Sequence, residues 1–182
     1  MPMEERVESS INIVGTTIES LKYNLDEEHI KDMFTNILIS DMTKDKKEKV
    51  LPAYIEIVKQ LSSKDAVLLK TLRELHTRQL SVLMMRDSDR NTGSYRKINY
   101  VIVPYAGRTI TPDLVSLDNL ERLGLIKILN STKITSEAQL CESTFNYVKN
   151  HYKSSSDGII TYEQGLFEVT DLGANFIDVC TR

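Results

Sequence analysis

Histidine and cysteine are the side chains that most often supply catalysis or bind a metal ion, and this chain has few of them. It contains His29, His76 and His151, and its two cysteines are Cys141 and Cys180. No histidine has a second histidine or a cysteine at the short spacing typical of zinc ligands, and the patterns CxxC and HExxH do not occur. The sequence therefore predicts neither a metal site nor a cofactor site.

Two other arrangements could in principle do chemistry. His76 could meet Cys141 or Cys180 in space as a Cys–His pair, but a single histidine among apolar leucines far more often has a structural role. Asp87 and Asp89 stand between arginines in a polar stretch, which is typical of a neutralised surface loop and not of the rigid cleft that paired catalytic carboxylates need. We therefore expect that the protein is not an enzyme.

Basic side chains are concentrated in two polar stretches, which makes these stretches the candidates for contact with a partner. The lysines of Asp41–Lys49 alternate with acids, a pattern that favours a solvated loop over a phosphate contact. In Arg86–Lys97 a similar mixture surrounds the predicted turn Asn91-Thr92-Gly93. Because residues of surface loops can vary without destabilising the core, such loops often carry the residues that bind a specific partner. The candidate partner-binding residues are Arg86, Arg90, Arg96, Lys97, Lys46 and Lys47.

Composition limits the function classes that remain. The 182 residues carry a net charge of −3, with a sequence pI near 5.7, which argues against a general binder of polyanions. Two cysteines are too few for a disulfide framework and suggest a reducing compartment. No apolar run approaches the roughly 18 residues that a membrane helix needs, and no signal peptide is recognisable. We therefore expect a cytoplasmic protein without a membrane segment.

The first 78 residues have the pattern of a helical bundle. Apolar stripes at helical spacing predict four helices: the first from Glu4 to Asn24, the second capped by Asp26, the third with Pro52 in its first turn and the fourth capped by Ser62 or Ser63. The expected core residues of the last three helices are Ile30, Met33, Phe34, Ile37, Leu38, Tyr54, Ile55, Ile57, Val58, Leu61, Leu68, Leu69, Leu72 and Leu75.

The first predicted helix has a heptad-like apolar seam. Its residues are Val7, Ile11, Val14, Ile18, Leu21 and Leu25, which step by four and three in alternation. One interpretation is that this seam packs inside its own domain, and the other is a homodimer through the N-terminal helix. The first is favoured, since three heptads are short for a free-standing coiled coil.

Residues 79–182 have a different pattern, which suggests a winged-helix-like half. Leu80–Met85 and Ile98–Val103 look like strands. Leucines line one face of a helix over Asp113–Leu123, Gly124 ends it, and an apolar strand begins at Leu125.

A helical insertion at about 136–153 and a C-terminal helix complete this half. The insertion should bury Leu140, Cys141, Phe145, Val148 and Tyr152. Two hairpin strands, Ile159–Tyr162 and Leu166–Val169, should then form a wing around Glu163-Gln164-Gly165. Thr170 should cap the last helix, whose expected inner residues are Leu172, Phe176, Val179 and Cys180.

Winged helices often bind DNA, so a DNA-binding transcriptional regulator is the alternative function. In that case the helix over Asp113–Leu123 would face the phosphates. It carries Asp113, Asp118 and Glu121 against Arg122, a net charge of −2 that would oppose docking. The sequence therefore favours a protein partner over nucleic acid.

Two blocks of the sequence resemble a known family. LDEEHIKDMFTNILISDM (Leu25–Met42) and VLPAYIEIVKQLSSKDAVLLKTL (Val50–Leu72) are similar to the central blocks of the bacterial abortive infection alpha family. SLDNLERLGLI and VTDLGANFIDVC resemble its C-terminal pattern. The family more often has His at the position of Leu51. The resemblance implies a bacterial protein linked to phage exclusion, and it supplies no catalytic residues to carry over.

Together these observations predict a mainly α, α+β protein, with an N-terminal helical bundle over residues 1–78 followed by a winged-helix-like C-terminal half over 79–182. The expected function is a non-enzymatic interaction or regulatory module in phage defence.

Overall fold

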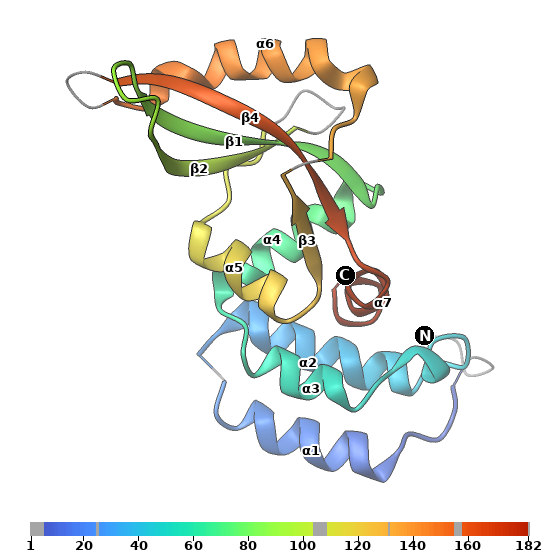
Figure 1. Cartoon of the computed structure of the whole chain (residues 1–182). Coiled ribbons are helices and arrows are strands. Elements are labelled where there is room, and N and C mark those ends of the chain that lie inside the picture. The colour runs from blue at the N-terminus through green and yellow to red at the C-terminus, as the bar shows by residue number, and fades with distance from the viewer. Residues whose placement is uncertain (1–5, 25, 104–108, 131, 155–157, 182) are drawn as a thin grey trace. The chain divides into compact units, whose positions relative to one another are not determined.

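The computed structural model describes residues 6–24, 26–103, 109–130, 132–154 and 158–181 (Figure 1). These residues form a mixed α+β protein in two compact units. The first unit contains the chain up to His76, Arg122–Leu125 and the chain from Asp171 onward. The second contains Thr77–Glu121 and Ile126–Thr170. This division differs from the expected one, because the last helix joins the N-terminal helices.

The first unit is helical, and its longest helix is α2. Its elements are α1 (Ile11–Leu21), α2 (Glu28–Asp41), α3 (Ala53–Val58), α4 (Ser63–Glu74) and α7 (Asp171–Cys180). α2 contacts each of the other four helices. Phe34, Ile37, Tyr54, Leu69 and Phe176 are all fully buried, and the rings of Tyr54 and Phe176 meet edge to face at 5.2 Å between centroids. The predicted apolar stripes of α2, α3 and α4 are therefore confirmed as the core, except for Leu38 and Leu75, which are only half-buried.

Side chains from α2 and the loop after it explain why α7 belongs to the first unit. The last carbonyls of a helix have no partner within the helix. The side chain of Asn36 donates to the Cys180 carbonyl at 3.1 Å, and Ser40 donates to the Val179 carbonyl at 3.0 Å. The Lys46 ammonium donates to the Asp178 carbonyl at 2.7 Å. Three successive carbonyls at the end of α7 are thus satisfied by this unit.

The helix starts were predicted with mixed success. Ser62 caps α4, and with Asp65 it forms a capping box, in which the Ser62 N–H donates to the carboxylate at 2.7 Å. Pro52 stands at the N-cap of α3, one position before the helix begins. The prediction for α2 was wrong by one residue, because Glu27 and not Asp26 occupies the N-cap.

The first helix is shorter than predicted and buries a different face. The backbone N–H of Ser10 and the hydroxyl of Ser9 both donate to the buried Asp41 carboxylate, just before α1 begins at Ile11. Its buried residues are Ile13, Thr17 and Ser20, while Ile11 is 91% exposed and Ile18 47% exposed. Packing of the whole heptad seam inside the unit is therefore wrong. A homodimer through this helix stays a prediction, and Glu4 and Leu25 lie outside the described residues.

The second unit is built on an antiparallel sheet of four strands. They are β1 (Gln79–Asp89), β2 (Tyr95–Val103), β3 (Ile126–Leu129) and β4 (Gly158–Val169), and they lie side by side in the order β2-β1-β4-β3. All three neighbouring pairs are antiparallel, and β1 pairs with β4 along its whole length. A register shift between Met85 and Arg86 interrupts the pairing of β1 with β2.

Two helices, α5 (Leu114–Arg122) and α6 (Ala138–Val148), accompany the sheet. α6 lies within the predicted insertion and runs over one face of the sheet (Figure 1). It completes an apolar cluster made of Leu83, Met85, Val101, Val103, Cys141 and Val148. α5 begins and ends close to its predicted bounds, and Gly124 follows it with a φ of 73°, as expected of a residue that ends a helix.

The predicted wing does not form at its expected place. β4 runs without interruption through Glu163-Gln164-Gly165, where a turn was expected. A side chain at Gly165 would meet the Leu129 carbonyl oxygen at 3.0 Å, so the glycine permits the close approach of the chain at the end of β3. The hairpin that would define a winged helix is therefore not formed at these residues. The DNA-binding alternative needs such a wing beside the helix that would face the phosphates, so it is not supported.

The remaining outcomes concern the inner face of α7, two predicted loops and the expected absence of a membrane helix. Leu172 is 37% exposed, so it is not one of the fully buried residues of α7, among which Ile177 is found instead. Residues 104–108 of the predicted loop before α5 and residues 155–157 of the predicted turn before β4 lie outside the described residues. No helix in the described part of the chain is long and apolar enough to cross a lipid bilayer.

Candidate functional site

The β1–β2 hairpin ends in a tight turn that is organised by one aspartate. The Asp89 carboxylate accepts hydrogen bonds from the backbone N–H groups of Asn91 at 2.8 Å and Thr92 at 2.9 Å. These bonds stabilise the ionised form and lower the pKa of Asp89. Gly93 adopts a φ of 70°, which a residue with a side chain rarely does. The predicted turn is confirmed, and one of the two carboxylates of the hairpin faces its own backbone.

Arg86 is occupied within the sheet. Its guanidinium forms an ion pair with Glu163 on β4 and lies 3.9 Å from the centroid of the Tyr95 ring on β2. Its side chain is 20% exposed. Arg86 therefore ties three strands together, and the structure gives it a packing role that the sequence did not suggest.

Other cations of the hairpin lie on the surface. The Arg96 side chain is 76% exposed, and its guanidinium makes only a long 3.5 Å contact with Asp87, whose own side chain is 5% exposed. Arg90 and Lys97 are exposed, and Tyr95 is 54% exposed. We call Arg90, Tyr95, Arg96 and Lys97 the hairpin patch. It presents positive charge and an aromatic ring, while Asp87 is buried and Asp89 is held by the backbone of the turn.

The lysines of the other predicted loop hold the first unit together. Lys46 and Lys49 each place their ammonium 2.8 Å from an Asp178 carboxylate oxygen near the end of α7. Lys47 donates to the backbone carbonyl of Glu8. A cation near a helix C-terminus is favourable for the helix dipole. Lys46 and Lys47 were proposed as partner contacts, and the structure shows instead that both already bind groups of their own unit.

The Lys46–Asp178–Lys49 cluster should make stability depend on pH. The pKa of Asp178 is lowered from its ordinary 3.8, first by the hydrogen bond from Lys46 and then by that from Lys49. A carboxylate with a lowered folded pKa stabilises the protein above its unfolded pKa and loses this contribution as the pH falls through the folded pKa. Because Asp178 is 37% exposed, the contribution should stay below about 1 kcal/mol. Asp178→Asn should therefore melt below wild type at neutral pH.

Melting curves at several pH values check this expectation. The difference between wild type and Asp178→Asn should shrink as the pH drops below 3.8, where the wild-type carboxylate takes up its proton. Asp118→Asn, at an exposed position of α5, is the control. A wild-type advantage over Asp178→Asn that is equally large at acidic and neutral pH would show that the ion pairs do not carry it.

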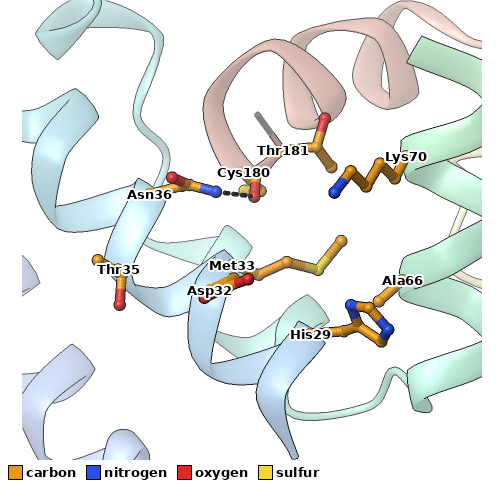
Figure 2. A pocket seen from close by; sticks show the side chains of 9 residues that line it. All are labelled: His29, Asp32, Met33, Thr35, Asn36, Ala66, Lys70, Cys180 and Thr181. Carbon is orange, nitrogen blue, oxygen red and sulfur yellow. Dashed lines mark hydrogen bonds between the residues drawn. The ribbon is translucent and has the colours of Figure 1, made fainter. Parts of the chain in front are cut away.

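A pocket of about 140 Å³ lies among α2, α4 and α7 in the first unit (Figure 2). Its polar lining comes from His29, Asp32 and Asn36 on α2, Lys70 on α4 and Thr181 after α7. This pocket could not be predicted from the sequence, since the lining residues are spread over some 150 positions of the chain. Only the packing of three helices brings them together.

The cysteines have no activated thiol. Cys180 borders the pocket, and its burial raises its pKa well above the ordinary 9.0. Burial also raises the pKa of Cys141 on α6, which lies beside Ser81 of β1. A thiol with a raised pKa is a poor nucleophile at neutral pH. The histidine that borders the same pocket as Cys180 is His29, and not the His76 of the hypothetical Cys–His pair.

The described residues contain no cluster of three or more His, Cys, Asp or Glu side chains that could hold a metal ion. What the structure offers is a basic hairpin on a sheet and a polar pocket among helices. The structure therefore defines the protein as a mixed α+β protein with two candidate binding surfaces.

The sequence model of the abortive infection alpha family matches residues 1–180. Because the match covers nearly the whole chain, the protein belongs to this family, as the two central blocks indicated. No curated protein and no solved structure matches the chain.

Proposed function

We propose that the protein is a component of phage defence that acts by binding a protein partner and not by catalytic turnover. Family membership across residues 1–180 supports the abortive-infection context. The observation that carries the mode of action is the hairpin patch, in which cations are exposed while Asp87 is buried and Asp89 accepts hydrogen bonds from the turn. The partner surface that fits this patch is acidic.

The geometry of the hairpin suits a docking element. Side chains alternate between the two faces of a strand, so Tyr95 and Lys97 share one face of β2 while Arg96 lies on the other. Arg86 stacks on Tyr95 from the neighbouring strand and thereby limits the motion of the ring. A partner that docks on the Tyr95 face would meet a preorganised ring beside Lys97, and preorganisation lowers the entropy cost of binding.

The test is protection of bacteria in which expression of the gene lowers phage plating. The triple variant Arg90→Ala, Arg96→Ala, Lys97→Ala should restore plating at least about tenfold, since a combined loss of about 1.4 kcal/mol of binding free energy weakens binding tenfold. Its soluble level should match wild type, because all three residues are exposed.

A second triple variant is the matched control. Lys127→Ala, Lys133→Ala, Lys153→Ala removes the same charge from exposed positions of the same unit and should keep full protection. Full protection by the hairpin variant would contradict the proposed surface. Loss of protection by a stably folded His76→Ala variant would contradict binding without turnover, since His76 belongs neither to the hairpin patch nor to the pocket among α2, α4 and α7.

A further inference from the structure

The pocket among α2, α4 and α7 is lined by an exposed cation, Lys70, for which the described residues supply no partner. Lys70 extends from α4 into the space between Met33 and Thr181 (Figure 2). Its ammonium has no hydrogen bond or ion pair with another described residue, in contrast to Lys46 and Lys49 of the same unit. A lysine directed into a pocket without a protein partner can bind the oxygen atoms of a ligand.

Further donors surround the same space. Arg73 stands one helical turn beyond Lys70 on α4, and its guanidinium lies 3.4 Å from the Thr181 hydroxyl. Asn36 is held in place, because its side-chain nitrogen donates to the Cys180 carbonyl at 3.1 Å. The opposing charge is Asp32, and His29 is the remaining titratable group of the lining. Among the lining residues Lys70 is the cation and Asp32 the opposing carboxylate, so the Lys70 ammonium is the group of the pocket that can bind an anion.

The size and the floor of the pocket restrict the ligand. The volume of about 140 Å³ is close to the roughly 150 Å³ of a protein cavity that admits one benzene molecule. Met33, Ala66 and Cys180 are buried and form an apolar part of the wall. Low polarity on one side strengthens an ionic contact on the other. The pocket therefore suits a charged group with few carbon atoms.

We propose that this pocket binds the oxyanion group, carboxylate or phosphate, of a small molecule, with Lys70 as the principal ligand-binding residue. The site lies outside the hairpin patch, so it does not depend on the proposed protein-binding surface. A defence protein with such a site would respond to a small anionic metabolite as well as to its partner.

The test is a titration of the full chain, followed by the backbone amide NMR signals, with inorganic phosphate and separately with acetate at constant ionic strength. Saturable shifts are expected at Asn36, Ala66, Lys70 and Thr181. Saturation by one anion identifies its group as the ligand chemistry, and saturation by both identifies the shared oxyanion. Shifts that stay linear for both anions would overturn the proposal.

Three variants sharpen the result. Lys70→Gln should weaken binding about tenfold or more, the size expected for the loss of a charged hydrogen bond. Asp32→Asn should tighten anion binding, because it removes the opposing charge. Lys22→Gln removes an exposed cation that does not line the pocket and should leave binding unchanged. Equal weakening by Lys22→Gln, or weakening by Asp32→Asn, would contradict an anion site centred on Lys70.

Discussion

Replacement of Gly173 by alanine is expected to destabilise the first unit by about 3 kcal/mol or more, which is at the upper end for overpacking. A Cβ atom at Gly173 would lie 1.9 Å from the Leu125 carbonyl oxygen and 2.8 Å from its carbonyl carbon. Both are backbone atoms, so no side-chain rotation can relieve the clash. The start of α7 would have to move away from the chain that follows Gly124.

Gly15 provides the matched control for this prediction. It lies inside α1, and a Cβ atom there would meet nothing within 4 Å. Gly15→Ala should therefore stabilise the protein by about 0.5–1 kcal/mol through higher helix propensity. Guanidinium unfolding followed by circular dichroism compares the two variants. If Gly173→Ala unfolds at the wild-type midpoint, the close packing of α7 on Leu125 is wrong.

In the second unit, Leu83→Ala is expected to cost about 2–5 kcal/mol, as large-to-small changes in a core do. Leu83 is fully buried on β1 and belongs to the apolar cluster that also contains Val101 and Cys141. Its loss would leave a cavity between the sheet and α6. Since β1 is hydrogen-bonded on both sides, its backbone cannot easily move to fill the space.

Hydrogen exchange of the β1 and β4 amides measures how far Leu83→Ala destabilises the second unit. Protection should fall strongly in Leu83→Ala. Val115→Ala removes an apolar side chain that is 75% exposed on α5 and should change stability by no more than about 0.5 kcal/mol. Similar exchange in both variants would mean that the cluster under α6 does not stabilise the sheet.

The sequence alone determined the elements whose cause is local. The apolar stripe of α2 and the capping box of α4 depend on residues three or four positions apart, so their pattern is visible without a fold. The turn at Asn91-Thr92-Gly93 and the end of α5 at Gly124 depend on single residues with unusual backbone freedom. The family relationship was also recognisable, because its two central blocks are continuous in sequence.

Tertiary structure decided the features that depend on distant partners. Glu163-Gln164-Gly165 has a turn-like composition, but pairing with β1 holds it extended. α1 has a regular apolar seam, and yet the face that is buried contains Thr17 and Ser20.

The two candidate sites show the same division. The hairpin cations were identified from the sequence, but only the fold showed that Arg86 is paired while Arg96 is exposed. The sequence placed Lys46 in a solvated loop, but only the fold showed that its ammonium donates to a carbonyl near the end of α7. The pocket around Lys70 combines α2, α4 and α7. Periodicity describes which face of a helix is apolar, whereas the choice of partner for each face and charge is set by packing between segments far apart in the chain.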